Sequence, residues 1–428
     1  MRIHKIATAS VVLVGITAAA CTDITSLVQV NPGQVSAATL YVPSNAQLLV
    51  NGAISDFECA YTRYVVGSGL LTDELSNAIG ALANFDYDAR RLLTNATYGT
   101  GVCGANQQPP IYSTLSTARG SADTVLARLR EWTDASLPVG VNRTRLIGQA
   151  ATYAGYSLVL LGEGMCTAAV NLSAELTPAQ LFGEAKVRFD SAVTAATTAN
   201  DAATLNLALL GRARTLLNLN QPAAAGIDAA RIPTTFVAST GTDNVNVRRQ
   251  NFAFLSINQN SFSTVDAAFR GLTVNGLPDP RVAVSNSGRP GTAVGTVVWT
   301  ADKYPLVSTS TAIARYAEAQ LIVAEARQAA GDLTGAASAI NVVRATRAGV
   351  PAYEVGGQSS AQVLATIIED RRRELFLEGH RLGDMRRYLV PLAPAAGTPY
   401  PAGGGVYGTQ ACFPLPDVER INNPNIAK

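Results

Sequence analysis

The segment EDRRRELFLEGHRLGDMRR, residues 369–387, decides the fold. Its acidic and basic residues recur three or four positions apart, a spacing that brings side chains together on one face of a helix. Apolar residues repeat at intervals of four and seven through the same region, so we expect one long helix that begins near Ser360 and continues through the charged segment. The ion pairs expected within it are Glu369 with Arg373, Arg371 with Glu374, and Glu378 with Arg381.

The charged segment has two interpretations, one catalytic and one structural. Glu374 and Glu378 share a helical face, as an acid/base couple would require. A glycosidase pair must straddle a sugar bond, usually from different elements, and the neighbouring arginines would keep both carboxylates ionised. We therefore interpret the segment, including His380, as a structural clamp. The predicted charge network comprises Glu369, Arg371, Arg373, Glu374, Glu378, Arg381 and Asp384.

Helical patterns also occur outside this segment. Pro178 follows Thr177, and proline is favoured in the first turn of a helix, while apolar residues recur every four positions after it. The pattern predicts a mostly α fold of tetratricopeptide-like helix-turn-helix pairs, with long irregular loops and a few short strands, although no fixed-period repeat is visible. The expected helices span about 115–132, 143–161, 178 onward, 202–219, 311–331 and 332–349.

The chain is expected to form one domain with three parts. Between residues 234 and 303, Asn, Gly, Thr and Ser are dispersed among aromatic and β-branched residues, which is typical of loops and short strands. Helical-repeat folds grow continuously, so a single domain over 21–428 is expected despite the length. Its parts are an N-terminal helical part at about 36–235, a loop-rich insertion at about 236–305 and a C-terminal helical part at about 306–428.

The N-terminus has the pattern of a lipoprotein signal peptide over residues 1–20. Two basic residues precede an apolar run at 6–16, which is shorter than the roughly 20 residues that span a bilayer, and small residues follow it. This pattern predicts cleavage before Cys21 and acylation of its thiol. Ala18 stands where lipoprotein signals usually carry leucine, so an ordinary secreted protein with an incidental Cys21 is the alternative.

Composition excludes several functional classes. The chain has 33 basic residues, and removing the signal peptide leaves 31, equal to the number of acidic residues. No block of Lys and Arg of the kind that neutralises phosphates is present. Nucleic acid is therefore not an expected partner, because binding it requires clustered positive charge. Neither a P-loop nor a dinucleotide-binding glycine motif occurs, and no cofactor is expected. A hydrophobic content of 47% and a charged content of 15% are typical of a large globular chain.

Four cysteines follow Cys21, and the mature chain has one histidine, His380. An even number of cysteines in a secreted chain favours two disulfides, whose three pairings stay open at this stage. No two cysteines have a metal-binding spacing, so no metal site is expected. A nucleophilic triad would have to use His380, whereas a glycosidase needs only carboxylates and is not excluded. The cysteines are Cys59, Cys103, Cys166 and Cys412.

Several motifs in the C-terminal third occur in a characteristic order. RYAEAQL at 315–321 is followed by AEA at 324–326, NVVR at 341–344 and RAG at 347–349, before the charged segment at 369–387. LPDPR at 277–281 precedes them, and FPLP at 413–416 and NNPN at 422–425 follow. This succession resembles the SusD/RagB family, whose R-Y-A-E helix, N-x-x-R helix and E-R-x-x-E block it matches. The match is strong over about residues 278–428. In the N-terminal half, the resemblance rests mainly on the helix pairs and on the lipoprotein signal peptide.

The resemblance implies a function as well as a SusD-like α-α superhelix. It implies a non-catalytic, lipid-anchored protein of the outer membrane that faces the cell exterior and binds nutrients, most often glycans. The expected partner is a SusC-type TonB-dependent outer-membrane transporter. Two alternatives from other classes are an envelope glycoside hydrolase that uses a carboxylate pair and a helical-repeat scaffold protein.

Sugar recognition requires flat aromatic faces and a few amide, carboxylate or guanidinium groups, usually on loops. Loop-like stretches at 73–98 and within the insertion supply such residues, although core packing is the commoner role for each aromatic. The mature chain has only two tryptophans, Trp132 and Trp299, so peptides or other nutrients stay open as ligands. The candidate ligand-binding residues are Asn77, Asn84, Phe85, Tyr87, Arg90, Trp299 and Tyr304.

Overall fold

The structure describes most of the chain after residue 35. The predicted signal peptide at 1–20 and the predicted lipidation site Cys21 lie outside the described residues. Within the described part, no helix combines the length and apolar character that a membrane span requires. The computed structural model describes residues 36–80, 84–104, 107–401 and 404–427.

The chain divides into two units, Met1–Val42 and Pro43–Lys428. The described part of the first unit contains the short helix α1 (Ala37–Leu40). Ser36 caps this helix, because its side chain accepts a hydrogen bond from the backbone N–H of Thr39. All other elements belong to the second unit.

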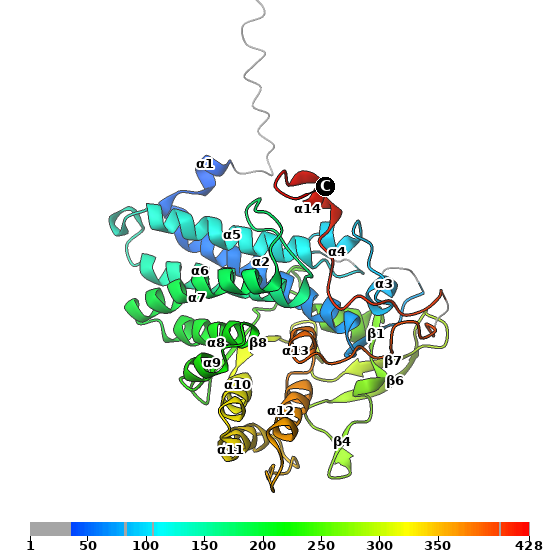
Figure 1. Cartoon of the computed structure of the whole chain (residues 1–428). Coiled ribbons are helices and arrows are strands. Elements are labelled where there is room, and N and C mark those ends of the chain that lie inside the picture. The colour runs from blue at the N-terminus through cyan, green and yellow to red at the C-terminus, as the bar shows by residue number, and fades with distance from the viewer. Residues whose placement is uncertain (1–35, 81–83, 105–106, 402–403, 428) are drawn as a thin grey trace, which may run out of the picture. The chain divides into compact units, whose positions relative to one another are not determined.

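The second unit is mostly helical, as predicted. Successive helices pack side by side, each against the next, from the blue and cyan helices to the yellow ones in Figure 1. This arrangement confirms the predicted mostly α fold of helix pairs. In chain order the main helices are α2 (Ala46–Leu71), α5 (Tyr112–Glu131), α6 (Arg143–Gly164), α7 (Pro178–Thr198), α8 (Ala202–Asn218), α9 (Pro222–Ala229), α10 (Tyr316–Ala329), α11 (Leu333–Arg344) and α12 (Ser360–Glu374).

Local sequence explains where α7 begins and why it packs closely. The side chains of Thr177 and Gln180 form a capping box around Pro178, which occupies the first turn. Phe189 of α7 is fully buried. A Cβ atom at Gly211 of α8 would lie 2.4 Å from the Phe189 ring, and one at Gly155 of α6 would lie 2.9 Å from it. Glycine at both positions therefore lets three helices meet around one ring.

The predicted long helix through the charged segment is wrong in one respect. Helix α12 ends at Glu374, and the chain turns before α13 (Arg381–Arg387) begins. Leu377 and Gly379 have positive φ angles of 53° and 70° in this turn. The backbone N–H of Leu377 donates to the Glu74 carboxylate at 2.8 Å, an interaction that a continuous helix would not allow. A tertiary contact thus overrides the local helical pattern.

The beginning of α10 also differs from the prediction. The helix was expected near residue 311, but 312–315 form strand β8, and α10 begins at Tyr316. Strand β8 pairs antiparallel with β2 (Val237–Ser239), which places Ala314 opposite Ala238. The β-branched and small residues before Tyr316 therefore satisfy their backbone groups in a sheet.

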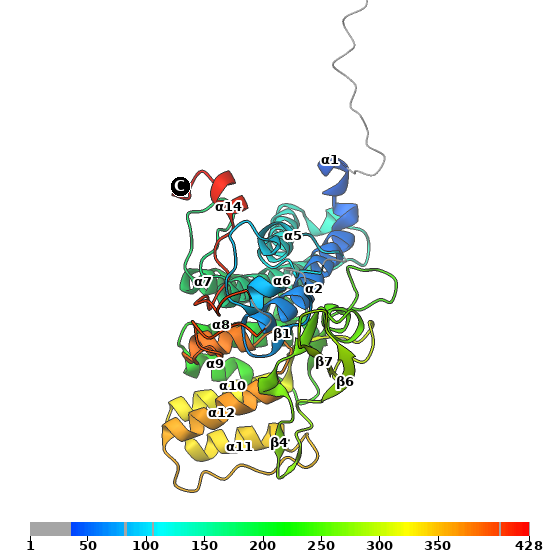
Figure 2. The ribbon, with the colours of Figure 1, turned by 90° about the vertical axis from the view of Figure 1, so that its right-hand side faces the viewer.

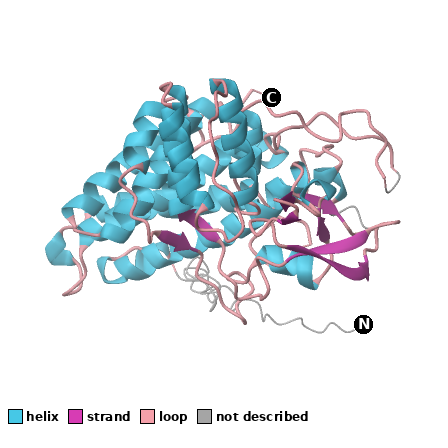
Figure 3. Cartoon of the chain, turned by 90° about the horizontal axis from the view of Figure 1, so that it is seen from below, coloured by secondary structure: helices cyan, strands magenta, loops and turns pink. Residues whose placement is uncertain are grey.

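Among the described residues, the strands form four separate two-stranded antiparallel sheets. The pairs are β1 with β3, β2 with β8, β4 with β5, and β6 with β7, and Figures 2 and 3 show most of them beside the helices. The sheet of β1 and β3 brings residues 75–77 against 263–265, so it joins the end of α2 to the insertion. Their bounds are β1 (Leu75–Asn77), β3 (Ser263–Val265), β4 (Thr273–Val274), β5 (Leu277–Pro278), β6 (Val284–Pro290), β7 (Val297–Ala301) and β8 (Ala312–Arg315).

Short helices and two disulfides complete the second unit. Cys59 pairs with Cys103 and Cys166 with Cys412, which decides among the pairings that the sequence left open. The second disulfide ties the C-terminal loop to the end of α6. The short helices are η2 (Pro43–Asn45), α3 (Phe85–Asp88), α4 (Thr97–Thr100), η3 (Asp134–Ser136), η4 (Phe254–Gln259), η5 (Ala267–Phe269) and α14 (Asp417–Asn422).

The charged segment forms ion pairs, but mostly with other partners than expected. Glu369 does pair with Arg373, at 2.6 Å. Arg371 pairs with Asp384 at 2.8 Å instead of Glu374, and Arg381 pairs with Asp73 at 2.6 Å instead of Glu378. The turn after α12 explains the second correction, because it takes Glu378 and Arg381 off the helix on which they would have been neighbours. Arg371 and Glu374 both stay on α12, but Glu374 pairs with Arg315 and Arg347 instead.

The two glutamates considered as a catalytic couple are each held by cations. Glu374 pairs with Arg315 at 2.8 Å and with Arg347 at 2.6 Å. Glu378 pairs with Arg315 at 2.9 Å and also contacts Lys303. Both glutamate side chains are buried. Their carboxylates thus join α12 and the following turn to the insertion, to the end of β8 and to the chain just after α11.

A buried carboxyl beside His380 makes stability depend on pH. Glu318 is fully buried at the start of α10, and its Oε1 atom lies 3.8 Å from His380 Nδ1. Neither atom has a hydrogen-bond partner among the described residues. Burial raises the pKa of Glu318 to about 7, although Arg214 and Arg371 act in the opposite direction. Burial, followed by the same arginines, lowers the pKa of His380, so the imidazole is uncharged at neutral pH.

We expect Glu318→Gln to stabilise the protein more at pH 8 than at pH 5. A raised folded pKa means that ionised Glu318 opposes folding, an effect that begins above the ordinary pKa of 4.5 and is complete above about 7. The difference in unfolding free energy between variant and wild type should therefore grow by about 3 kcal/mol across that interval. Urea unfolding of both proteins at the two pH values measures it. The same difference at both pH values would contradict the assignment.

Candidate functional site

A cleft of about 450 Å³ lies where four distant segments meet. The segments are the chain around β1 and α3, the chain from β3 to η5, the turn between β6 and β7, and the C-terminal loop after α13. We call this space the insertion cleft. It is lined by Asp73, Ser76, Asn77, Asp88, Thr264, Asp266, Ala267, Ala268, Arg270, Val294, Gly295, Thr296, Val297, Ala393, Pro394, Tyr400, Pro401 and Tyr407.

Two carboxylates of the cleft accept hydrogen bonds from neutral donors. The Oδ2 atom of Asp88 accepts from the backbone N–H of Asn77 and from the hydroxyl of Tyr400, both at 2.7 Å. Burial raises the pKa of Asp88 to about 6, and these two hydrogen bonds act against the rise. Asp266 accepts from the backbone N–H of Ala268 at 2.8 Å and from the hydroxyl of Ser76. These bonds fix both carboxylates in place.

The cationic side of the cleft consists of Arg270. Its Nε donates to the backbone carbonyl of Val265 at 2.8 Å, and its guanidinium carbon lies 5.5 Å from the centroid of the Trp299 ring. Trp299 is half-buried on β7, and its backbone N–H donates to the hydroxyl of Thr264 at 2.8 Å. The strands of the insertion therefore hold Arg270 in position.

Aromatic rings form a rigid wall on the side of the C-terminal loop. The Tyr400 and Tyr407 ring centroids lie 5.0 Å apart, and Phe85 meets Tyr400 edge-on at 4.8 Å. The guanidinium carbon of Arg90 lies 4.7 Å from the Tyr407 ring centroid. Tyr400 is 6% exposed and Tyr407 is 7% exposed, so this cluster supports the wall more than it presents open faces.

The cleft offers a ligand fixed hydrogen-bonding groups of both kinds. Carboxylates accept from hydroxyl groups, whereas the guanidinium of Arg270 can donate. In the described part of the chain, no group of three His, Cys, Asp or Glu residues is placed to hold a metal ion. The arrangement is chemically suited to a polar ligand rich in hydroxyl groups.

The C-terminal motifs identify the family that the chain resembles. The model of the SusD family matches residues 299–423. This C-terminal part of the chain is SusD-like. This result confirms the resemblance read from the motifs, and the matched region includes the charged segment and the C-terminal wall of the cleft. No curated protein matches the chain.

Solved structures of SusD-like proteins share the fold of this SusD-like chain. A SusD superfamily protein from Bacteroides fragilis is 16% identical, with a TM-score of 0.68 over 90% of this chain and 99% of the other. A SusD-like carbohydrate-binding protein from Bacteroides vulgatus is 17% identical, with a TM-score of 0.66 over 89% of this chain and 96% of the other. A laminarin-binding SusD-like protein is 14% identical, with a TM-score of 0.62 over 90% and 98%.

The structure brings some of the predicted ligand-binding residues to the cleft. Asn77 lines it directly. Phe85 is half-buried in the aromatic wall, Arg90 is buried against Tyr407, and Trp299 lies under Arg270. These four residues surround the cleft of the SusD-like chain, although Asn77 alone among them lines it.

Three other predicted residues pack in the interior. Asn84 is buried, and its amide donates to the carbonyl of Phe262 at 3.1 Å. The hydroxyl of Tyr87 donates to the carbonyl of Pro109 at 2.7 Å, and that of Tyr304 donates to the carbonyl of Leu377 at 2.7 Å. These hydrogen bonds lie within the fold and the three side chains do not line the cleft, so we omit them from the proposed binding surface.

Sequence reasoning missed the main polar groups of the cleft. Asp88 lies within the loop-like stretch at 73–98, between the candidates Tyr87 and Arg90. Its carboxylate is a group suited to sugar hydroxyls, and this could have identified it. Asp266 and Arg270 lie in the insertion without any local motif. Tyr400 and Tyr407 stand among prolines and glycines, and an aromatic residue in such a loop is the signal that could have found them.

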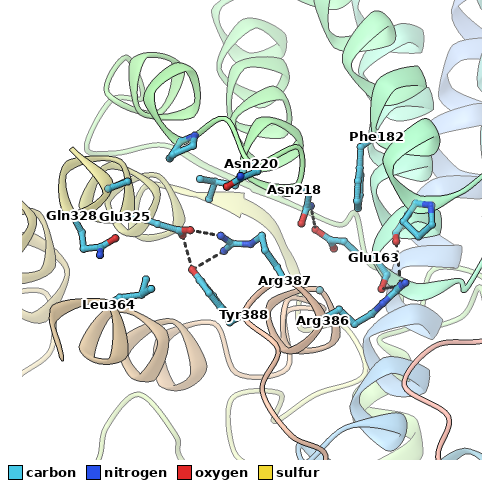
Figure 4. Close-up of a pocket in the computed structure, with 16 residues that line it drawn as sticks. Glu163, Phe182, Asn218, Asn220, Glu325, Gln328, Leu364, Arg386, Arg387 and Tyr388 are labelled. Carbon is cyan, nitrogen blue, oxygen red and sulfur yellow. Dashed lines mark hydrogen bonds and ion pairs between the residues drawn. The ribbon is translucent and has the colours of Figure 1, made fainter. Parts of the chain in front are cut away.

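A second cavity, of about 640 Å³, opens between the helices (Figure 4). Its polar residues largely satisfy one another. Glu325 accepts from Arg387 and Tyr388, and Glu163 accepts from Asn218 at 2.8 Å and from the buried Arg214. Arginines thus neutralise both glutamates of the helical cavity, whereas Asp88 and Asp266 of the insertion cleft accept from uncharged donors.

Proposed function

We propose that this SusD-like chain binds a glycan in the insertion cleft and delivers it to a transporter without transforming it. The observation that carries the proposal is the cleft itself, in which Asp88, Asp266 and Arg270 are held as fixed hydrogen-bonding groups. The likeness of the fold to a laminarin-binding SusD-like protein supports a glycan as the ligand.

The chemistry of the cleft fits a sugar in three respects. Its volume of about 450 Å³ lies within the roughly 300–1,000 Å³ typical of small-molecule sites. Hydrogen bonds to the protein hold the acceptors before a ligand arrives, which reduces the entropy lost on binding. Val294 and Val297 lie exposed at the cleft and offer apolar contact to the C–H faces of a sugar ring.

The transporter partner and the anchor are part of the same proposal. We propose acylation at Cys21, an outer-membrane location facing the cell exterior and assembly with a SusC-type TonB-dependent transporter. The SusD-like motifs support this assignment. A mild-detergent pull-down of the tagged protein from its native membrane tests it. Recovery of a large barrel protein in near-equal amount is expected, whereas recovery of the chain alone under conditions that preserve other envelope complexes would reject the partnership.

We expect Arg270→Ala to weaken glycan binding by at least about tenfold, because a charge-assisted hydrogen bond to a ligand contributes about 1.5–3 kcal/mol. Arg128→Ala is the matched control, since Arg128 is exposed on α5 and pairs with Glu131. A panel of soluble polysaccharides is screened first, and the two variants are then titrated calorimetrically with the best ligand. Equal affinity of both variants for the polysaccharide would show that the insertion cleft is not the binding site.

The same titrations distinguish binding from hydrolysis. We expect no new reducing ends after prolonged incubation of the polysaccharide with the protein. Release of sugar that disappears in Asp88→Asn would instead favour the envelope hydrolase, with Asp88 and Asp266 as its carboxylates.

A further inference from the structure

The charges of the insertion cleft bear on which glycans it accepts. Among the described residues that line it, three carry carboxylates, Asp73, Asp88 and Asp266, and one carries a guanidinium, Arg270. The net charge that a ligand meets depends on which of these groups are already neutralised within the protein.

Asp73 is neutralised internally. Arg381 donates to both of its oxygens, at 2.6 and 2.7 Å, and the pair is buried. Arg372 lies 3.9 Å from the same carboxylate. Asp73 therefore contributes little negative charge to the cleft.

Asp88 and Asp266 are not neutralised in this way. Asp88 accepts from a backbone N–H and from a tyrosine hydroxyl, and Asp266 accepts from a backbone N–H and a serine hydroxyl. Within the described part of the chain, neither carboxylate has an arginine or lysine nitrogen at ion-pair distance. Arg90 packs on Tyr407 of the aromatic wall and does not line the cleft.

Arg270 alone faces these two carboxylates from the cleft lining. Its Nε is committed to the carbonyl of Val265, and its guanidinium lies against Trp299. The cleft thus presents two carboxylates that lack a close ion pair against one guanidinium. Arg270 attracts Asp266, and Arg90 attracts Asp88, only from beyond ion-pair distance. Asp266 is half-buried and more accessible to a ligand than Asp88, which is 8% exposed.

A ligand carboxylate in this cleft would meet like charge in partly desolvated surroundings, where repulsion is less screened than in water. Sugar hydroxyls and ammonium groups would instead donate to the two carboxylates. Discrimination between ligands arises from repulsion of the disfavoured ligand as much as from attraction of the favoured one. We propose that the cleft selects neutral and amine-bearing glycans over glycans that carry uronic acids, with Asp266 as the main determinant. This inference rests on the proposed glycan-binding function.

The test uses oligosaccharides that share one backbone and differ in charge. The probes are cellohexaose and N-acetylchitohexaose as neutral ligands, the chitosan hexamer as the amine ligand and the hexamer of β-1,4-glucuronate as the acidic ligand. A second series pairs laminarin with its C6-oxidised, carboxylated derivative. Calorimetric titrations at low salt should show at least about tenfold tighter binding of the neutral or amine ligand than of the acidic one within a series.

Asp266→Asn tests the determinant. Asparagine can still accept from the N–H of Ala268 and contact Ser76, so the local structure is retained while the charge is removed. We expect the preference for neutral over acidic ligand to fall about threefold or more in this variant. Glu354→Gln is the control, because Glu354 is exposed outside the cleft, and it should leave the preference unchanged.

The outcomes separate the inference from the function on which it rests. Equal or tighter binding of the acidic ligand would overturn the selectivity while leaving glycan binding intact. An unchanged preference in Asp266→Asn would overturn the role of that residue. Absence of binding to every probe in both series, and to the wider polysaccharide panel, would overturn the proposed function and the inference together.

Discussion

Asp384→Ala is expected to lower the free energy of unfolding by about 3–5 kcal/mol, the range for breaking a buried ion pair. Asp384 accepts two hydrogen bonds from Arg371, at 2.8 and 2.9 Å, and the Arg371 side chain is only 3% exposed. Removing the carboxylate would leave that guanidinium buried without its partner.

Glu369→Ala is the matched control in the same charged segment. Its side chain is 44% exposed, and it pairs with Arg373 and Arg372. Exposed pairs contribute about 0–1 kcal/mol, so a loss of at most about 1 kcal/mol is expected. Urea unfolding at pH 7 compares the two variants. Equal losses would show that burial does not govern the network, which would contradict this account of the segment.

The loss caused by Asp384→Ala should also depend on pH. Burial acts to raise the pKa of Asp384, but Arg371 and Arg387 hold it below the ordinary value of 3.8. A depressed folded pKa means that the stabilisation is present above about 4 and disappears as the pH falls through the folded pKa. The gap between wild type and Asp384→Ala should therefore narrow in acid.

The double variant Cys166→Ser/Cys412→Ser is expected to lose about 2–5 kcal/mol of stability. Its disulfide joins residues 246 positions apart, so its removal frees a long loop in the unfolded chain. In the folded protein it secures the C-terminal loop, where Cys166 and Phe413 are also linked by a backbone hydrogen bond of 2.8 Å. Because Tyr400 and Tyr407 come from that loop, glycan affinity should fall as well.

Cys59→Ser/Cys103→Ser provides the comparison, since that disulfide joins residues 44 positions apart. Chain entropy makes the longer connection more stabilising by about 1.5 kcal/mol, from 1.5RT ln(246/44). Thermal and urea unfolding of both double variants measure the difference. A variant at Cys166 and Cys412 that kept wild-type stability and wild-type glycan affinity would show that the C-terminal loop does not need the disulfide.

The sequence predicted the helices well where local signals agree. Helix α6 begins at the predicted residue 143, and Thr177 with Pro178 marks the start of α7. Capping and apolar periodicity are both local, so a single sequence contains them. The break after Glu374 could not be predicted, because the backbone N–H of Leu377 is held by Glu74, more than three hundred positions earlier in the chain.

The same reasoning explains why the candidate site was predicted only in part. Asn77 and Phe85 stood out because loop amides and aromatics are suited to sugars. Asp266, Arg270 and Tyr407 reach the cleft only through strand pairing and a loop fixed far away in the sequence. Tyr304 has a suitable side chain for a site, but its burial depends on a contact with Leu377 that no local pattern reveals.

The charged segment and the cleft are connected through one ion pair. Arg381 begins α13 and holds Asp73, which lines the insertion cleft. The C-terminal helices therefore position one wall of the cleft, while the sheet of β1 and β3 positions another. The charged segment at 369–387 is therefore structural, and it also holds a wall of the proposed binding site in place.

A crystal structure of the protein with the best-bound oligosaccharide tests the central claim most directly. The account predicts the sugar in the insertion cleft, with its hydroxyls within hydrogen-bond distance of Asp266 and Arg270. Sugar found in the helical cavity beside Phe182 and Asn218, with the insertion cleft empty, would contradict it.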